Sequence, residues 1–294
     1  MSDDQDFLEL SGIHSANISA KTELSSGNFS LLKGLSPLSL RILNDASRLL
    51  YVSKGVEIMH EGDNPHDLYF IKKGKVAIAR STAGQQKVAA VLKEGDLFGE
   101  FGLLRKKPRV ASVFTTEESI LIRVKSESVH QVLQADAEFK ARLERLLSLR
   151  LLSSFFFSHP VFSALPDVIR SALSNELQVE YIQANERIFS QGNKPNGVCL
   201  IISGEVEVSH VNKKGQDILV EVRRNSDVLG EIATKDGTAL AYSATTASHL
   251  DMLKIDSASM KRLHDAYPDV YKRLETYISK RASQTASRLK DINK

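Results

Sequence analysis

The sequence predicts an α+β protein in which two tandem antiparallel β-barrels of the jelly-roll kind are each flanked by helices. Two observations predict this fold. The sequence repeats itself once, and each copy contains several short runs in which apolar and polar residues alternate. Alternation of period two is typical of half-buried strands, and many short strands at even spacing favour a small barrel.

The repeat is visible in pairs of turn-forming residues that share one constant offset of about 130 positions. The pairs are Gly62 and Gly192, Pro65 and Pro195, and Gly74 and Gly204. After a one-residue insertion, GDLFGE in the first copy matches SDVLGE in the second, and the threonine pairs at 115–116 and 245–246 restore the original offset. Chance does not readily produce such agreement, so the chain is a tandem duplication.

Each copy is expected to contain the same elements in the same order. A short amphipathic helix opens the copy (37–50 and 166–177) and a long helix closes it (126–152 and 257–288). Between them, LYFIKKGKVAIAR and VCLIISGEVEVSH alternate as strands do, and STAGQQK and VNKKGQD are typical of hairpin turns. The closing helix of the first copy carries an apolar stripe, which indicates either a fixed core helix or a lid over a ligand.

These elements divide the chain into three parts. Residues 1–28 are rich in Ser, Asn and Asp, and we expect a flexible acidic segment, either a solvated tail or a partner-binding one. Residues 29–157 are expected to form the first domain, and residues 158–294 the second, which ends in a basic helix. The boundary is placed near Ser158–Pro160, where SHP interrupts an apolar run.

The composition is that of an ordinary globular protein, with 42% hydrophobic residues and a net charge of +3, which argues against general polyanion binding. The single cysteine, Cys199, lies in the apolar run VCLII and is expected to be a buried structural thiol. With no disulfide within the chain and no signal peptide, the protein fits a reducing compartment. The apolar run Leu146–Phe157 contains Arg150 and is shorter than the roughly 20 residues of a membrane span. We therefore expect a cytoplasmic protein.

The stretch GEFGLLRKKPRVAS places a carboxylate and an arginine around a glycine turn. Gly99 and Gly102 let the backbone approach a ligand closely, and the N–H groups at a helix start favour an anion. Pro108 makes the return of the chain rigid and precedes Arg109, whose planar guanidinium suits a singly charged phosphate. Glu100 would repel a phosphate, so we expect it to accept from a hydroxyl such as a ribose 2′-OH. One phosphate plus one ribose hydroxyl describes a cyclic nucleotide.

The stretch FGEFGLLRKKPRVASV resembles the phosphate-binding cassette of the cyclic nucleotide-binding domain family, and the resemblance covers residues 29–294 as two tandem copies. It implies that Glu100 holds the ribose 2′-hydroxyl and that Arg109 holds the cyclic phosphate. Gly102 departs from the family's usual alanine. The ligand site that the resemblance implies consists of Phe98, Gly99, Glu100, Phe101, Gly102, Arg109, Val110, Ala111 and Ser112.

In this family a Thr or Ser directly after the arginine favours guanine, whereas this chain has Val110. The resemblance therefore implies cAMP rather than cGMP, and a cyclic dinucleotide stays an alternative. Two other interpretations of the stretch are a surface ion pair between Glu100 and Arg109 and a nucleic-acid patch at RKKPR. The ion pair explains neither the proline nor the matching barrel, and the patch has no interleaved aromatic residues to stack bases.

The second copy of the cassette reads LGEIATKDGTALAYSATT and is degenerate. Glu231 keeps the place of the carboxylate, but the threonine alignment puts Ala239 where Arg109 stands in the first copy. Lys235 is the only cation in this stretch. Without the arginine a phosphate lacks its charge partner. We therefore expect the second domain to keep the fold without this ligand, and to serve as a protein contact surface, a dimer interface or a pocket for another ligand.

Three classes of output are compared. A transcription factor would need a helix-turn-helix module, whereas the residues after the second barrel read as a closing helix with a basic tail. A kinase regulatory subunit would share the tandem arrangement, but residues 1–28 hold no paired arginines for an inhibitor sequence. An enzyme would need a catalytic constellation, and the eight histidines are scattered without metal spacing. His60 and His66 are expected at the surface.

The sequence therefore predicts a non-enzymatic cyclic nucleotide sensor that acts by ligand-dependent contact with an unidentified protein partner. The ligand is expected in the first domain only. The alternatives are a ligand-independent scaffold or adaptor and a kinase-regulatory-subunit-like protein. A homodimer is a further alternative, while specific DNA binding and membrane binding are not expected.

Overall fold

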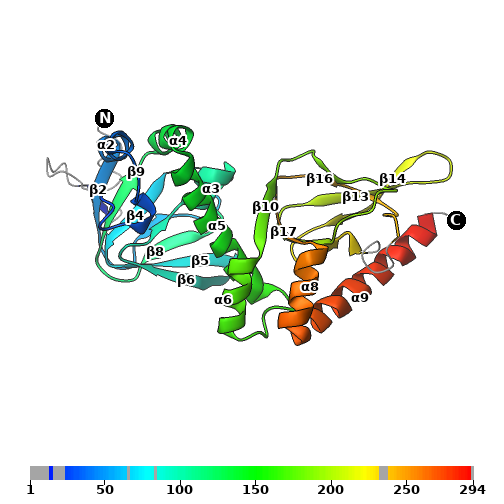
Figure 1. Ribbon diagram of the computed structural model, residues 1–294. Helices are drawn as coiled ribbons and strands as arrows, with labels where there is room; N and C mark the ends of the chain where they lie inside the picture. Colours follow the sequence, from blue (N-terminus) through cyan, green and yellow to red (C-terminus); the bar gives the residue numbers. More distant parts are fainter. Residues whose placement is uncertain (1–12, 16–23, 65–66, 83–84, 232–237, 293–294) are drawn as a thin grey trace. The chain divides into compact units, whose positions relative to one another are not determined.

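The computed structural model describes residues 13–15, 24–64, 67–82, 85–231 and 238–292. The chain divides into two compact units, Met1–Leu147 and Ser148–Lys294. Each unit contains two antiparallel sheets together with helices (Figure 1). The predicted α+β fold, with two tandem copies of one antiparallel architecture, is confirmed.

In the first unit, one sheet has the order β1-β2-β9-β4-β7 and the other the order β3-β8-β5-β6. The strands are β1 (Ile13–Ser15), β2 (Ser47–Val52), β3 (Glu57–Met59), β4 (Leu68–Lys73), β5 (Lys75–Thr82), β6 (Gln85–Lys93), β7 (Leu97–Phe98), β8 (Ser112–Thr115) and β9 (Ser119–Val124). The helices are η1 (Ser30–Leu32), α2 (Pro37–Asp45), α3 (Glu100–Arg105), α4 (Ser126–Ala135) and α5 (Ala137–Ser158), within which the unit ends.

The second unit repeats this plan with sheets of order β10-β17-β12-β15 and β11-β16-β13-β14. The strands are β10 (Gln178–Ile182), β11 (Arg187–Phe189), β12 (Val198–Ser203), β13 (Val206–Val211), β14 (Asp217–Arg223), β15 (Val228–Leu229), β16 (Ser243–Thr246) and β17 (Leu250–Ile255). The helices are α6 (Asp167–Glu176), α8 (Ser257–Ala266) and α9 (Pro268–Ile292).

Two buried apolar clusters hold the first cassette at its ends. Phe98, the last residue of β7, packs in the cluster that includes Ile71 and Val76. Leu103, in α3, packs in a separate cluster with residues of α4 and α5 such as Phe139. Because these anchors are fully or almost fully buried, the residues between them have little freedom to move relative to the barrel.

The opening helix of the first copy is shorter than the sequence predicts. It begins after Ser36, whose Oγ accepts from the N–H of Ser39 at 3.0 Å, and Pro37 occupies its first turn. It ends at Asp45, since Ser47–Val52 pairs with β9 as a strand. The expected helix over 37–50 is therefore wrong at its end, because strand pairing outweighs the local helical spacing.

Each expected closing helix is in fact a pair of helices. Asp136 has an extended backbone that ends α4, and its Oδ1 accepts from the N–H of Phe139 at 2.8 Å in the first turn of α5. Tyr267 lies between α8 and α9, and α9 begins with Pro268. The prediction that these spans are helical is right, but the prediction of one continuous helix in each span is wrong.

The N-terminal segment contacts the first unit at Ile13–Ser15 and at Leu24. The flexibility expected for the segment as a whole stays a prediction. Ile13–Ser15 pairs with β2, and Leu24 is only 2% exposed. The N–H of Leu24 donates to Oδ1 of Asn44 at 2.8 Å, and Nδ2 of Asn44 donates to the carbonyl of Leu24 at 3.2 Å. Residues 1–12 and 16–23 lie outside the described part of the chain.

Several smaller expectations can be compared with the structure. β5 and β6 pair as a hairpin up to Thr82 and Gln85, although residues 83–84 of its turn lie outside the described residues. The second hairpin turn is confirmed, since Oδ1 of Asn212 accepts two backbone N–H groups there. Cys199 is buried, which raises the pKa of its thiol to about 12. No described helix is long and apolar enough to cross a membrane.

Candidate functional site

The first cassette lies where β7 turns into α3. Gly99 joins them with a φ of 97°, a left-handed conformation that glycine adopts readily. A Cβ at this position would lie 2.5 Å from the carbonyl oxygen of Asp67 and 3.1 Å from Nη1 of Arg109. Glycine is therefore required here, and its missing side chain lets the arginine approach the turn.

Arg109 is fixed against this turn through both its backbone and its side chain. Its N–H donates to the carbonyl of Asp63, and its carbonyl accepts from the N–H of Gly62, each at 2.8 Å. Its Nη1 donates to the carbonyl of Gly99 and its Nη2 to the carbonyl of Asp67, each at 2.9 Å. Since Arg109 is 4% exposed, its guanidinium is held by protein groups rather than by solvent.

The remaining nitrogen of this guanidinium has no acceptor. Nε of Arg109 is buried and makes no hydrogen bond with the residues that the structure describes. Burial lowers the pKa of Arg109, while the nearby Tyr69, Asp67 and Glu100 act in the opposite direction. A buried N–H without an acceptor costs free energy, so this nitrogen marks a position where an outside acceptor fits.

Glu100 is the first residue of α3 and is 6% exposed. Because Glu100 and Arg109 are both buried, the alternative of a surface ion pair between them is wrong. Phe101 is half-buried and Gly102 is buried. Their N–H groups belong to the first turn of α3, where backbone N–H groups have no carbonyl acceptor within the helix.

The other predicted site residues flank the turn on both sides. Phe98 is buried in the core, and Val110 is 36% exposed. Ala111 and Ser112 are buried, and Oγ of Ser112 accepts from the N–H of Glu61 at 3.0 Å. The predicted residues thus come from two adjoining stretches, one leaving β7 and one entering β8, which the contact between Gly99 and Arg109 joins.

Asp67 also belongs to this site, and the sequence analysis missed it. Its carbonyl accepts from Arg109, while its Oδ2 accepts from Nε of Arg123 at 2.6 Å and its Oδ1 from the N–H of Ser126 at 2.9 Å. Ser126 begins α4, so one aspartate connects the cassette arginine to the closing helices. The available signal was its position, a carboxylate directly before the buried strand β4.

The second cassette is shifted by one residue from the predicted alignment. Leu240, not Ala239, exchanges 2.8 Å backbone hydrogen bonds with Gly192 and Asn193, as Arg109 does with its own loop. The one-residue shift between the two copies therefore persists through β16, and the original offset is not restored at the threonines. The place of the arginine is taken by an apolar side chain, so the prediction that it holds no arginine stands. Lys235 lies outside the described residues.

Glu231 is bound by other side chains of its own domain. Arg223, at the end of β14, forms a two-point ion pair with it, with 2.8 Å between Nη2 and Oε1 and 2.9 Å between Nη1 and Oε2. Tyr242 donates its hydroxyl to Oε2 at 2.6 Å, and Thr285 of α9 donates to Oε1 at 2.8 Å. All four side chains are fully buried, and we call them the Glu231 network.

The charges within the Glu231 network are matched. Burial alone would raise the pKa of Glu231, but the charge of Arg223 and the hydrogen bonds from Arg223 and Tyr242 lower it below its usual value. Each nitrogen of Arg223 has an acceptor: Nε donates to Glu221 at 2.9 Å, and Nη1 also donates to the carbonyl of Val228. In this respect the guanidinium of Arg223 differs from that of Arg109, and it leaves no donor for an anion.

Arg223 is not among the residues predicted from the sequence, because it lies outside the cassette. It lies eight residues before Glu231, at the end of β14. Its position two residues after Glu221 is the feature of the sequence that could have indicated it. Residues two apart on a strand share a face, so an acid and an arginine at that spacing indicate a charged cluster. Tyr242 and Thr285 carried no comparable signal.

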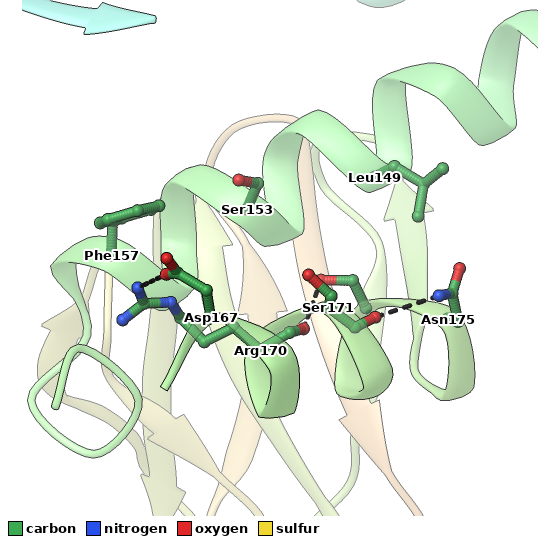
Figure 2. A pocket seen from close by; sticks show the side chains of 8 residues that line it. Leu149, Ser153, Phe157, Asp167, Arg170, Ser171 and Asn175 are labelled. Carbon is green, nitrogen blue, oxygen red and sulfur yellow. Dashed lines mark hydrogen bonds and ion pairs between the residues drawn. The ribbon is translucent and has the colours of Figure 1, made fainter. Parts of the chain in front are cut away.

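A cavity of about 430 Å³ lies in the second unit, between the end of α5 and α6 (Figure 2). At one end the guanidinium of Arg170 lies 4.3 Å from the centre of the Phe157 ring and pairs with Asp167. None of the residues that line the cavity belongs to a cassette. It is therefore separate from the predicted ligand site.

The histidines do not form a further site in the described part of the chain. No group of three or more His, Cys, Asp or Glu residues there is arranged to hold a metal ion. His60 is exposed, and its Nδ1 lies 2.8 Å from Oε1 of Glu57, which raises the pKa of His60. His66 lies outside the described residues.

Two antiparallel barrels, each with a left-handed glycine and a buried glutamate directly after a short strand (β7 and β15), define a class of ligand-binding domains in tandem. Residues 49–136 and 179–267, one stretch in each unit, match the model of the cyclic nucleotide-binding domain family. Together these stretches cover more than half of the sequence. The chain belongs to the cyclic nucleotide-binding domain family.

The chain is also similar to curated relatives. The chain is 25% identical to a cAMP-dependent protein kinase regulatory subunit of Eremothecium gossypii, over 80% of this chain and 48% of that protein. It is 23% identical to the subunit of the same name from Neurospora crassa, over 81% and 61%. The chain thus spans about half to three fifths of the length of these relatives.

Among solved structures, the regulatory domain of Toxoplasma gondii PKA with cAMP is similar at 20% identity and a TM-score of 0.40, over 85% of this chain and 92% of that one. A regulatory subunit of a cAMP-independent protein kinase A from Trypanosoma cruzi, bound to guanosine, is similar at 18% identity and a TM-score of 0.40. It is matched over 90% of this chain and 89% of that one.

Proposed function

We propose that this chain is a cyclic nucleotide sensor that binds cAMP in its first domain only and signals through contact with a protein partner. The observation that carries the proposal is Nε of Arg109, a buried donor that has no acceptor among the described residues and lies beside a turn that requires glycine. Because two carbonyls already fix this guanidinium, its Nε–H points in one direction. Such a fixed donor on a cation suits an anionic oxygen.

In this proposal different residues of the cassette bind different parts of the nucleotide. Arg109 binds the cyclic phosphate, helped by the N–H groups of Phe101 and Gly102 in the first turn of α3. Glu100, buried beside that turn, accepts from the ribose 2′-hydroxyl. Ala111 and the other residues that enter β8 form the wall of the site, and the hydroxyl-free Val110 favours adenine over guanine.

Binding in the first domain alone is supported by what replaces the cassette arginine in the second. Leu240 offers no charge to a phosphate. Glu231 and Arg223 are already paired with each other, and every nitrogen of that guanidinium has an acceptor within the chain. A nucleotide phosphate would have to break this pair before it could gain a contact, which costs more than it returns.

The names of the relatives support a role for the chain as a regulator rather than an enzyme. Both curated relatives are named as regulatory subunits of a protein kinase, so we propose a protein kinase as the class of partner. A homodimer is the other form of protein contact that this proposal includes. A ligand-independent scaffold is the second candidate function, and it differs in predicting no nucleotide binding.

Titration calorimetry of the purified chain with cAMP tests the proposal. We expect one site per chain, and we expect Arg109→Ala to weaken binding by about 30-fold to several thousand-fold, equivalent to roughly 2–5 kcal/mol. Lys106→Ala is the matched control, since Lys106 lies in the same cassette with an exposed side chain, and it should bind as the wild type does. Two equal sites would contradict binding in one domain, and no heat with cAMP, cGMP or a cyclic dinucleotide would favour the scaffold.

A further inference from the structure

The helix α9 is bonded to the second barrel through side chains between Tyr277 and Arg288. α9 lies against β14 within one unit (Figure 1). Four of its side chains bond to the barrel: Tyr277 to the carbonyl of Ser226, Arg281 to Glu221 and Asp227, Thr285 to Glu231, and Arg288 to Glu221. Their spacing of three to four residues places all four on one face of the helix.

Thr285 is the buried centre of this face. Its Oγ1 accepts from Nη2 of Arg223 at 2.6 Å and donates to Oε1 of Glu231 at 2.8 Å. Because Glu231 lies in the cassette itself, α9 is bonded directly to the residue that corresponds to Glu100 of the first domain. The contact is fully enclosed, so water does not compete for it.

Tyr242 completes the connection from the other side of the cassette. Its hydroxyl donates to Oε2 of Glu231 and accepts from the N–H of Gly230 at 2.7 Å. A bound anion would accept a hydrogen bond from the cassette backbone and would pair with a cation. Here a tyrosine and a carboxylate of the chain supply these two contacts.

The first domain lacks these side chains. The N–H of Arg224 donates to Asp227 as that of Lys93 donates to Asp96, which places Leu92 at the position of Arg223. The matched contacts of Ser112 and Ser243 place Ala111 at the position of Tyr242. Of the three barrel residues in the Glu231 network, only the glutamate has a chemical counterpart in the first domain. The network is therefore a feature of the second copy and not of the duplicated fold.

We propose that the second domain is closed by its own side chains, and that the Glu231 network locks α9 onto the barrel in place of a ligand. The position of α9 is then set by the sequence and does not respond to a nucleotide. The second domain presents a constant surface, while any response to ligand arises in the first. This proposal does not depend on whether the first domain binds cAMP.

Hydrogen exchange of the full-length protein without any ligand tests the lock. In the wild type we expect the amides of the second half of α9 to exchange slowly. Thr285→Val keeps the shape of the side chain and removes its hydroxyl, and we expect exchange there to become at least about tenfold faster. Thr276→Val is the matched control, because it makes the same change on the exposed side of the same helix and should leave exchange unchanged.

Tyr242→Phe provides a second variant that does not alter α9, and it should also speed exchange in α9 because it removes a hydrogen bond from the same carboxylate. Addition of cAMP to the wild type should leave exchange of α9 unchanged. The lock is refuted if α9 already exchanges fast in the wild type, or if protection of α9 appears only with cAMP. Equal exchange in the Thr285→Val and Thr276→Val proteins would also refute it, as would unchanged exchange in Tyr242→Phe.

Discussion

Arg223 and Glu231 form a fully buried two-point ion pair, with donor–acceptor distances of 2.8 and 2.9 Å. The equivalent glutamate of the first domain, Glu100, lies in a cassette whose arginine keeps a buried nitrogen that no described residue accepts from. The charged side chains of the two cassettes are therefore balanced in different ways. In the second, the chain neutralises its own carboxylate, and in the first, Arg109 keeps a donor that an anion outside the chain can use.

The ion pair is expected to contribute strongly to the stability of the second domain. Arg223→Gln leaves the carboxylate of Glu231 buried without its cation, so we expect a loss of about 3–5 kcal/mol. The matched control is Arg224→Gln, because Arg224 pairs with Glu205 at a similar distance of 2.7 Å but at the surface, where about 0–1 kcal/mol is expected. Calorimetric unfolding of both variants measures the difference. Equal losses would mean that burial adds nothing to this pair.

Gly99 is expected to be irreplaceable for a reason that can be separated from its backbone conformation. Gly99→Ala places a Cβ 2.5 Å from the carbonyl of Asp67, whereas Gly62→Ala meets no atom within 4 Å at nearly the same φ. The Gly62 variant should lose only the roughly 1–2 kcal/mol of a left-handed alanine. We expect Gly99→Ala to lose clearly more and to weaken cAMP binding by displacing Arg109. If thermal unfolding gives both variants the same loss, the close approach is not what requires glycine.

The role proposed for Glu100 can be tested by changing the ligand and the protein together. If its carboxylate accepts from the ribose 2′-hydroxyl, Glu100→Ala should weaken cAMP binding much more than it weakens binding of 2′-deoxy-cAMP. The four affinities form a double-mutant cycle, for which we expect a coupling of about 1–3 kcal/mol. Losses that simply add would indicate that Glu100 organises the turn and does not contact the sugar.

The sequence predicted the duplication, the strand content and the first cassette, because each depends on local patterns that repeat in register. Residues such as Gly99, Glu100 and Arg109 lie within a dozen positions of one another, so their proximity follows from one turn. Asp67, which accepts from Arg109 and directly precedes β4, and Arg123 of β9, which bonds to Asp67, could not be found in this way. Their contribution depends on strand pairing that no short stretch of sequence specifies.

The second cassette shows where a pattern of identical residues misleads. Two adjacent threonines in each copy suggested an alignment in which Ala239 corresponds to Arg109. The backbone hydrogen bonds show that Leu240 takes this position. A residue inserted before the cassette shifts the second copy by one position through β16, and the doubled threonine concealed that this shift persists. The ion pair of Glu231 was missed for a related reason, since its partner comes from β14 and its third contact from α9, far apart in sequence.

His159 should make the stability of the second unit depend on pH. It is fully buried among the rings of Phe155, Phe162 and Tyr277, and its Nδ1 accepts from the N–H of Val161 at 3.2 Å. Burial lowers the pKa of His159 to about 4, against about 6.5 in an unfolded chain. As the pH falls below about 6.5, the unfolded chain takes up a proton that the folded one does not.

The stability contributed by neutral His159 is therefore complete above pH 6.5 and is lost as the pH falls towards 4, by about 3 kcal/mol in all. Urea unfolding of the full chain at pH 7, 5.5 and 4.5 measures this slope. In His159→Asn, which keeps an acceptor for the N–H of Val161 but cannot titrate, we expect a flatter dependence. The exposed His264 is the matched control, and His264→Asn should keep the wild-type slope. A His159→Asn protein that loses stability with acid as steeply as the wild type would show that other groups cause the dependence.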